Sequence, residues 1–295
     1  MANRNATISR VSALSATAED EIVAHLNRDG VAIVTGMFPK EHVDQVRQDL
    51  QHKFNTNSAD GSPYCATTTR RVSGLFGISN ACVDLAMHPL QLAVVNKLLT
   101  STYHFYVGSE KLTSVSKPTI SATAAFRLEP GGIQQGLHRD DVDYHTRPSD
   151  WPMLIGCFTA LTRVHAKNGA IVFIPGSNTW IDQDRRALVD ETVPAELEPG
   201  DTVIYLANTY HGLGGNTTQD ECCELVGIFM GKGFYRQTEN EYLAVPPERC
   251  KEMKLSAAAL RVLGYAVSPP FLGYIDFKDP VESIFGIDDD ETIKM

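Results

Sequence analysis

The alternation of apolar and polar positions divides the chain into a helical first part and a β-rich second part. Apolar residues recur at helical spacing over residues 15–30, which end at Gly30, and over residues 39–54, which begin with a proline. Both patterns predict amphipathic helices, and the apolar run 31–36 between them predicts a buried strand. A third helix is predicted over residues 81–99.

From about residue 103 the chain changes to short runs rich in β-branched and aromatic residues. Turn sequences such as EPGG, KNGA and EPGD separate these runs. This pattern is typical of an antiparallel sandwich or barrel. The expected strands lie at 103–108, 120–130, 153–161, 170–176, 201–208 and 223–234.

Residues 55–79 are polar and rich in glycine, and they predict a long loop. Long loops inside a compact domain are often functional. We therefore expect Tyr64 and the segment through Leu75 and Phe76 to form part of a lid over an apolar substrate. An ordinary surface loop is the competing interpretation.

Composition narrows the class of protein. Hydrophobic residues make up 43% of the 295 residues, as in a soluble globular protein, and the chain carries a net charge of -10. The acidic excess argues against nucleic acid or an anionic membrane as a partner, since both need a basic surface. The six cysteines form no CxxC pair, and no apolar run has the length of a membrane span or the form of a secretory signal.

These features together predict a cytoplasmic protein with reduced cysteines and one domain over residues 1–295. Its predicted parts are a helical segment over about 1–102, a β core over about 103–237 and a tail of helices and loops over 238–295. The fold class expected from this order is α+β.

The segment QQGLHRDDVDYH combines histidine and aspartate where a strand should end. Residues two apart on a strand point to the same side, so His138 and Asp140 can converge on one point. His211, at the end of a later predicted strand, is the best third member. Two histidines and one carboxylate suit a non-haem iron(II) site with open positions. A solvated acidic loop, an acid–base site or a hydrogen-bonded core histidine are the alternatives at this stage.

Several longer motifs resemble one family. The segments QQGLHRDD, NGAIVFIPGSNTW, LEPGDTVIYLANTYHGLGGNTTQDE, GFYRQTENEYLAVP and FLGYIDFKDP are similar to the phytanoyl-CoA dioxygenase (PhyH) family, above all to fungal members that tailor meroterpenoids and related secondary metabolites. The resemblance implies a double-stranded β-helix, that is, a cupin-like jelly roll with flanking N-terminal and C-terminal helices. It also implies Fe(II) at His138, Asp140 and His211. Gln135 and the pair Arg70–Arg71 match positions near the usual co-substrate, 2-oxoglutarate, and Gln135 and Arg71 are the residues expected to contact it.

The sequence departs from the family where 2-oxoglutarate is normally held. The family usually has an arginine about a dozen residues after the distal histidine, and that position falls on Cys223. The next residue, Glu224, would repel the co-substrate if it faced the same slot. Ile171 stands where family members often have a threonine. Binding of 2-oxoglutarate is therefore left open.

Three functions follow from an intact triad beside an altered co-substrate site. In the first, the iron enzyme works without 2-oxoglutarate on an apolar substrate that already carries its oxidising equivalents, such as an endoperoxide, and isomerises it with no net oxidation. A 2-oxoglutarate-independent endoperoxide isomerase of this kind is known in the fungal branch. In the second, the chain is an ordinary 2-oxoglutarate dioxygenase in which Lys232 or Arg236 supplies the missing charge. In the third, it is a supporting subunit of a heterodimeric oxygenase.

Other residues are open to two interpretations. Arg139 and Asp141 either orient the metal ligands or are exposed charges on a turn. His145 is either an acid–base group or a solvated loop residue, and no residue is singled out as a hydrogen-atom donor. We expect a homodimer, with a heterodimer formed with a homologue as the alternative.

Overall fold

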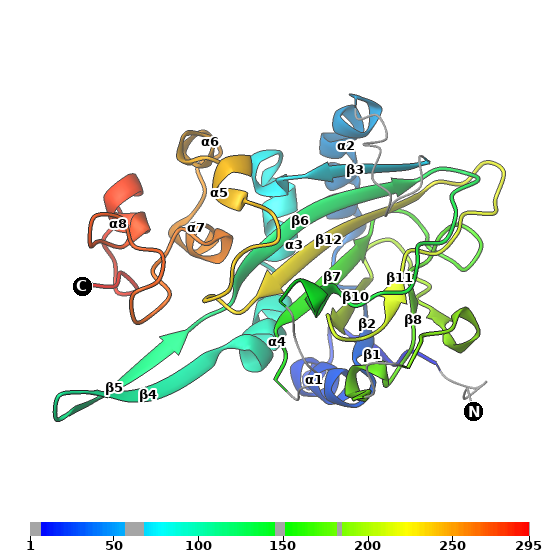
Figure 1. Cartoon of the computed structure of the whole chain (residues 1–295). Helices are drawn as coiled ribbons and strands as arrows, with labels where there is room; N and C mark the ends of the chain where they lie inside the picture. The colour runs from blue at the N-terminus through cyan, green and yellow to red at the C-terminus, as the bar shows by residue number, and fades with distance from the viewer. Residues whose placement is uncertain (1–6, 57–67, 145–150, 182–184, 295) are drawn as a thin grey trace. The chain divides into compact units, whose positions relative to one another are not determined.

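The computed structural model describes residues 7–56, 68–144, 151–181 and 185–294 (Figure 1). The chain forms two compact units. The first combines Met1–Ser73 with Ala124–Ile228, and the second combines Gly74–Thr123 with Phe229–Met295. One domain over residues 1–295 stays a prediction.

A seven-stranded, mostly antiparallel sheet dominates the first unit. The sequences of two of its strands, β6 and β12, cross the boundary between the two units. Its order is β1-β2-β10-β7-β12-β6-β3, and a small sheet of order β11-β8-β9 accompanies it. The large sheet consists of β1 (Arg10–Ser12), β2 (Val31–Thr35), β3 (Thr69–Ser73), β6 (Thr119–Leu128), β7 (Leu154–Ala160), β10 (Thr202–Leu206) and β12 (Cys223–Gly231). The small sheet consists of β8 (Val172–Phe173), β9 (Val193–Pro194) and β11 (His211–Gly212).

The predicted strand runs after residue 103 all contain observed strands, while the sheet also uses strands from the N-terminal part. Strand β10 is flanked by β2 on one side and β7 on the other, so residues 31–35 complete a sheet built mainly from later segments. The central strands β2, β7, β10 and β12 are buried almost throughout. Their near-continuous apolar sequences reflect this burial on both faces.

The helices of the first unit are α1 (Ala18–Asp29) and α2 (Lys40–Thr56), with 3-10 turns η2 (Asp140–Tyr144), η3 (Ser177–Thr179) and η4 (Val189–Glu191). Both long helices were predicted. Helix α1 ends at Gly30, whose φ of 75° is left-handed. A side chain there would also lie 2.1 Å from Thr209 Oγ1, so glycine is required twice over. Among the described residues, no helix combines the length and apolar character that a bilayer span requires.

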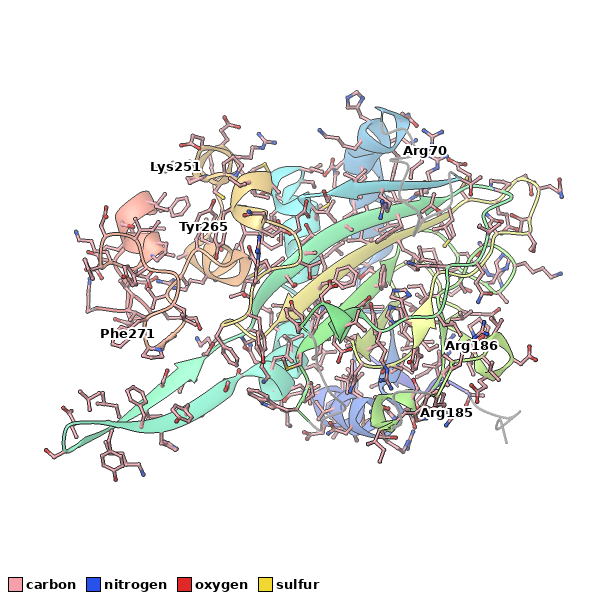
Figure 2. The ribbon with its side chains drawn as sticks, viewed as in Figure 1. Arg70, Arg185, Arg186, Lys251, Tyr265 and Phe271 are labelled. Atoms are coloured by element: carbon pink, nitrogen blue, oxygen red, sulfur yellow. The ribbon has the colours of Figure 1, made fainter. Side chains whose placement is uncertain are left out.

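A network of charged side chains connects α2 to the large sheet. Glu224 on β12 is 2% exposed and lies 2.7 Å from Arg47 Nε and 3.7 Å from Arg127 Nη1. Arg127 and Arg70 both pair with Glu129, at 3.1 Å and 3.3 Å (Figure 2 labels Arg70). Because side chains alternate along a strand, this network fixes which face of β12 points toward α2.

The second unit contains a hairpin and a set of short helices. The hairpin pairs β4 (Ser101–Val107) with β5 (Glu110–Ser116). The helices are the 3-10 turn η1 (Leu75–Gly77), α3 (Asn80–Ala86), α4 (Pro89–Leu99), α5 (Glu241–Ala244), α6 (Pro247–Glu252), α7 (Ala257–Leu263) and α8 (Pro280–Phe285). The single helix predicted over residues 81–99 is two helices, because His88 before Pro89 takes an extended ψ of 125°.

The predicted lid over residues 55–79 can be checked only in part, because the structure does not describe residues 57–67. Tyr64 lies outside the described residues. Residues 69–73 form β3, and Leu75 and Phe76 are fully buried in the second unit. Their burial contradicts a role at the surface of a lid. The glycines around them misled the prediction, since Gly74 is needed for its left-handed φ of 64° and a buried turn follows directly.

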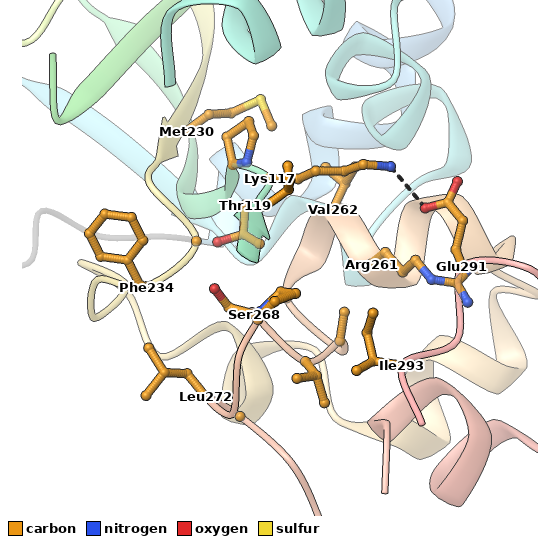
Figure 3. A pocket seen from close by; sticks show the side chains of 18 of the residues that line it. Lys117, Thr119, Met230, Phe234, Arg261, Val262, Ser268, Leu272, Glu291 and Ile293 are labelled. Carbon is orange, nitrogen blue, oxygen red and sulfur yellow. Dashed lines mark hydrogen bonds and ion pairs between the residues drawn. The ribbon is translucent and has the colours of Figure 1, made fainter. Parts of the chain in front are cut away.

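A cavity of about 590 Å³ lies within the second unit (Figure 3). Apolar side chains line most of it, among them Met230, Phe234 and Val262. Lys117 and Glu291 pair near it at 3.1 Å, and both remain well exposed. The volume falls in the range typical of small-molecule pockets.

Glu241 predicts a specific pH dependence of stability. Its side chain is fully buried at the start of α5, and Thr123 Oγ1 donates to it at 3.4 Å. Burial, helped by the charge of Glu239, raises its pKa to about 8 from 4.5. The folded chain therefore holds a proton that the unfolded chain releases, and stability should fall as pH rises from about 4.5 to about 8. Glu241→Gln should gain on the order of 3 kcal/mol over the native chain between pH 5 and pH 9 in urea unfolding.

Glu248→Gln is the matched control, because Glu248 is exposed and close by in the sequence. It should follow the native chain at both pH values. Equal differences between Glu241→Gln and the native chain at pH 5 and pH 9 would contradict this account of Glu241.

Candidate metal centre

His138, Asp140 and His211 converge in the first unit, as the sequence predicted. One ligand atom from each lies within 4.8 Å of the others. His138 and His211 face each other in an antiparallel bridge closed by two backbone hydrogen bonds of 2.9 and 3.0 Å. Asp140 begins η2, and its N–H donates to the carbonyl of Ala207 at 2.9 Å. Backbone pairing therefore positions all three side chains before any ligand is considered.

The two imidazole rings are held in the same way. Nδ1 of His138 lies 2.9 Å from the carbonyl oxygen of Gly136, and Nδ1 of His211 lies 3.0 Å from that of Thr209. Each carbonyl belongs to the residue two positions earlier. A carbonyl only accepts, so Nδ1 carries the proton in the neutral ring and Nε2 keeps its electron pair. This is the support that metal-binding histidines usually have.

Asp140 is fixed by a residue that the sequence reasoning missed. The hydroxyl of Tyr205 donates to Asp140 Oδ2 at 2.6 Å. Tyr205 is fully buried on β10, and burial together with the charge of Asp140 raises its pKa well above 10, so it stays a neutral donor. A tyrosine inside the apolar run TVIYL was the available signal, because a buried phenol needs a hydrogen-bond partner.

The donors face one another closely. His138 Nε2 lies 3.3 Å from Asp140 Oδ1, and His211 Nε2 lies 3.4 Å from Oδ2. Burial alone would raise the pKa of Asp140, but the charge of His211 and hydrogen bonds from both histidines and Tyr205 hold it well below its usual range. Burial lowers the pKa of His138, while the hydrogen bond and charge of Asp140 raise it more, so its net shift is upward.

This donor set fits a divalent transition metal. With both Nδ1 atoms protonated, neutral rings would direct two electron pairs at a carboxylate, and that arrangement is repulsive unless a cation or a proton lies between them. Two imidazoles and one carboxylate on one side leave further positions open, which suits Fe(II). Aromatic rings close the surroundings, since Phe173 stacks on His211 at 5.6 Å and Tyr205 lies 4.5 Å away.

Cys223 lies in the interior of the first unit, on the face of β12 opposite Glu224. Its side chain is fully buried, and Sγ lies 4.0 Å from the carbonyl oxygen of Gly169 in the segment before β8. Burial, helped by the charge of Glu224, raises the pKa of this thiol to about 12, so it is neutral. The concern that Glu224 faces the co-substrate slot is not supported, because Glu224 points toward Arg47 and Arg127.

Gln135 and Arg71, the residues expected near a co-substrate, lie on different elements. The side-chain oxygen of Gln135 accepts from the N–H of Leu213 at 3.1 Å. Gln135 also lines a hollow of about 800 Å³ with Arg185, Arg186 and Tyr210. Arg71 lies opposite Phe126 in the β3–β6 register, on the face of the sheet where Phe126 packs against Phe158. A role for either residue in binding a co-substrate stays a prediction.

The residues beside the ligands have structural contacts. Arg139 donates to the carbonyl of Ser177 at 2.8 Å and lies 4.4 Å over the ring of Tyr210, so it ties the ligand loop to η3. Asp141 is buried, which excludes an exposed charge there. His145 lies outside the described residues. Cys222 lies 3.9 Å from a guanidinium nitrogen of Arg127, yet burial and the hydrogen bond with Glu129 raise the pKa of its thiol.

Comparison with known proteins identifies the family. Residues 26–221 match the model of the phytanoyl-CoA dioxygenase (PhyH) family. The chain belongs to this family. Dioxygenase peniF of Penicillium patulum is 32% identical over 94% of this chain and 92% of its own length. Dioxygenase swnH1 of Metarhizium robertsii is 30% identical with the same coverage, and dioxygenase cnsJ of Penicillium expansum is 33% identical over 91% of this chain and 84% of its own. The PhyH-family chain is thus an enzyme of a dioxygenase family with fungal relatives.

Solved structures support the expected fold. The non-heme α-ketoglutarate-dependent epimerase SnoN from nogalamycin biosynthesis superimposes with a TM-score of 0.59 at 21% identity, over 78% of this chain and 89% of its own. HygX from Streptomyces hygroscopicus, solved with nickel and 2-oxoglutarate, gives a TM-score of 0.57 at 16% identity, over 76% and 90%. The predicted jelly-roll fold of this class of enzyme is confirmed.

Asp140→Asn should separate metal binding from stability. The amide Nδ2 of asparagine would donate to a histidine Nε2, which removes the repulsion of the metal-free site but weakens metal binding. Above the raised folded-state pKa of His138, where the neutral ring no longer forms an ion pair with Asp140, metal-free Asp140→Asn should be more stable than metal-free native protein by about 1 kcal/mol. Anaerobic Fe(II) or Ni(II) should raise the melting temperature of the native protein only.

At lower pH the metal-free native protein should instead be more stable than metal-free Asp140→Asn. The raised pKa of His138 means that its ion pair with Asp140 contributes stability below about pH 6.5, and that contribution is lost as pH rises through the folded pKa. His165→Ala is the control, because His165 pairs with Glu221 instead and should leave the metal response intact. A metal-induced shift of normal size in Asp140→Asn would exclude Asp140 as a ligand.

Proposed function

We propose that this PhyH-family enzyme uses Fe(II) without 2-oxoglutarate to isomerise an already oxidised apolar substrate, such as an endoperoxide, in fungal meroterpenoid biosynthesis. One observation carries the proposal. A complete His–Asp–His set converges in the same unit in which the family's arginine position is a buried, neutral thiol, Cys223.

The surroundings of Cys223 argue against tight binding of a dicarboxylate. A buried carboxylate needs a hydrogen-bonded cation, and arginine supplies one in bidentate geometry. Arg127 is an arginine on the neighbouring strand, but it is engaged with Glu129 and Glu224 on the other face of the sheet. Loss of such a partner costs about 3 kcal/mol, or roughly a hundredfold in affinity.

Lys232 and Arg236, the cations considered from the sequence, belong to the second unit. The ammonium group of Lys232 donates to the carbonyl of Leu99 at 3.0 Å, and burial lowers its pKa. Arg236 lines the cavity of that unit. These positions lend no support to either residue as a replacement for the missing arginine.

The protein's own contribution is to fix and enclose the reacting position. The carbonyls of Gly136 and Thr209 would orient His138 and His211 as ligands, and Tyr205 would hold Asp140 in place. The chemistry that bound Fe(II) supplies is reversible one-electron transfer, which suits a substrate that already contains a weak O–O bond. Phe173 packs on His211 and Phe158 on Tyr205, so the surroundings of the site include apolar rings, which would favour an apolar substrate. An isomerisation of this kind consumes no oxidant and releases no reduced product.

The decisive experiment is turnover of an endoperoxide by the purified chain with Fe(II) under nitrogen. The expected result is conversion to an isomer of unchanged mass, without 2-oxoglutarate and without succinate. A requirement for 2-oxoglutarate, with one succinate formed per product, would overturn the proposal and indicate a conventional dioxygenase.

Cys223→Arg tests the altered co-substrate site directly. Titration of the anaerobic Fe(II) protein with 2-oxoglutarate should give no charge-transfer band at sub-millimolar concentration in the native chain, and Cys223→Arg should restore the band with at least a roughly hundredfold gain in affinity. Cys222→Arg is the matched control, since it places the same charge one residue earlier, beside Glu129 on the other face. A strong band in the native chain would refute the argument without any variant.

A conventional 2-oxoglutarate dioxygenase is the second candidate, and one observation favours it. Arg186 lines the same hollow as Gln135 and offers a guanidinium close to an expected co-substrate residue. The curated relatives are named dioxygenases, and SnoN is named as α-ketoglutarate dependent. If the native chain does bind 2-oxoglutarate, Arg186→Ala should weaken that binding.

A further inference from the structure

The β4–β5 hairpin of the second unit leaves two strand edges unpaired among the described residues. Figure 1 shows it extending away from the helices of that unit. In its register Tyr103 lies opposite Ser114 and Phe105 opposite Leu112. Tyr103, Phe105, Val107 and Leu112 therefore share one face, and Tyr103 and Val107 are 67% and 59% exposed. A two-stranded hairpin is only marginally stable in water, so this one needs a covering partner.

The two edges of the hairpin differ in their chemistry. Strand β4 reads STYHFYV, with no proline, no Asp, Glu, Lys or Arg, and high β propensity. Strand β5 begins with Glu110 and Lys111. Natural proteins protect free edges with charges, prolines or bulges, and β4 has none of these in its seven residues. An unprotected edge of this kind can pair with another strand through its free N–H and C=O groups.

A second apolar segment lies beside the base of the hairpin in the same unit. Residues 271–277 expose five large apolar side chains, Phe271, Leu272, Tyr274, Ile275 and Phe277. Ser268, just before them, contacts Ser116 at the end of β5 through their hydroxyls at 2.7 Å. Phe271, the first residue of this segment, is labelled in Figure 2. We name the hairpin and residues 271–277 together the aromatic arm.

The exposed area of the aromatic arm matches a protein interface. Leaving out Tyr106, which the register places on the opposite face of the hairpin, its four exposed rings are 44–74% exposed, which at about 200 Å² per ring leaves on the order of 500 Å² of aromatic surface. That already reaches the largest patch usual on a monomer, and exposed aliphatic side chains extend it toward the roughly 800 Å² per partner of a standard interface. The net charge of -10 disfavours an anionic membrane as the occupant.

We propose that the aromatic arm is the homodimer interface, and that its occupant is the aromatic arm of a second copy of this chain. An antiparallel edge can pair with itself around a two-fold axis, which makes the contact self-complementary and closed. With the axis at His104, the midpoint of β4, Thr102 pairs with Tyr106 of the second copy and a four-stranded sheet results. The two copies of residues 271–277 then add apolar contacts at the same interface.

The hairpin register identifies the backbone groups that form this contact. The two-residue turn Gly108–Ser109 makes Val107 and Glu110 the closing pair. In an antiparallel ladder, hydrogen-bonded and non-hydrogen-bonded pairs then alternate. The N–H groups of Thr102, His104 and Tyr106 consequently point away from β5, toward the second copy.

His104→Pro tests this arrangement. It removes an outward N–H at the centre of β4 and leaves the ladder to β5 intact. By light scattering after gel filtration, the native chain should have twice the mass of 32.4 kDa, and His104→Pro should raise the dimer dissociation constant at least a hundredfold. Thr113→Pro is the matched control, because Thr113 lies opposite His104 and its N–H points to the other edge.

Hydrogen exchange on the native chain gives a second test that needs no variant. The amides of Thr102, His104 and Tyr106 should be protected at high protein concentration and exchange fast on dilution. A native chain that is monomeric at all concentrations, a dimer that His104→Pro leaves intact, or assembly only with a homologue would each overturn the proposal. Binding to neutral lipid vesicles by a monomeric chain would also overturn it, in favour of a membrane partner.

Discussion

Two neutral imidazoles and a carboxylate repel one another when they share a buried space with neither a cation nor a proton between them, and much of the first unit holds these groups together. The bridge between His138 and His211 pairs two segments more than seventy residues apart in sequence. The N–H of Asp140 reaches Ala207 beyond the end of β10, and Tyr205 on β10 supplies the hydrogen bond to its side chain. The strand order of the large sheet therefore also determines where His138, Asp140 and His211 lie.

The alternation of side chains along β12 decides how the co-substrate region is interpreted. Glu224 belongs to the face that meets α2, where two arginines neutralise it, so Cys223 must belong to the interior. An arginine at position 223 would enter that interior, while one at position 222 would lie beside Glu129. A shift of one residue along β12 thus moves a side chain from the interior of the unit to the face that carries Glu129.

The convergence of His138, Asp140 and His211 and most of the strands could be predicted because their signals are local or match a family motif. His138 and Asp140 are two residues apart at a strand end, and the β-rich runs have turn residues at both ends. Tyr205 was missed because its role depends on a partner 65 positions away. Strand β5 was missed because EKLTSVS is too polar to be distinguished from a loop by periodicity, and only its pairing with β4 makes it a strand.

Leu75 and Phe76 show the opposite error. Their glycine-rich surroundings are typical of a surface loop, but tertiary packing buries both side chains. A glycine in the sequence indicates that the backbone turns. It does not indicate whether the neighbouring side chains are buried or exposed. The direction of Glu224 was unpredictable for the same reason, since it depends on α2 packing against the sheet.

The backbone carbonyls behind His138 and His211 have a consequence for how the site could be filled. Because Gly136 and Thr209 orient both rings whether or not a metal is present, binding of a metal would require no rotation of either imidazole. A metal would then compete mainly with the protons bound at the site.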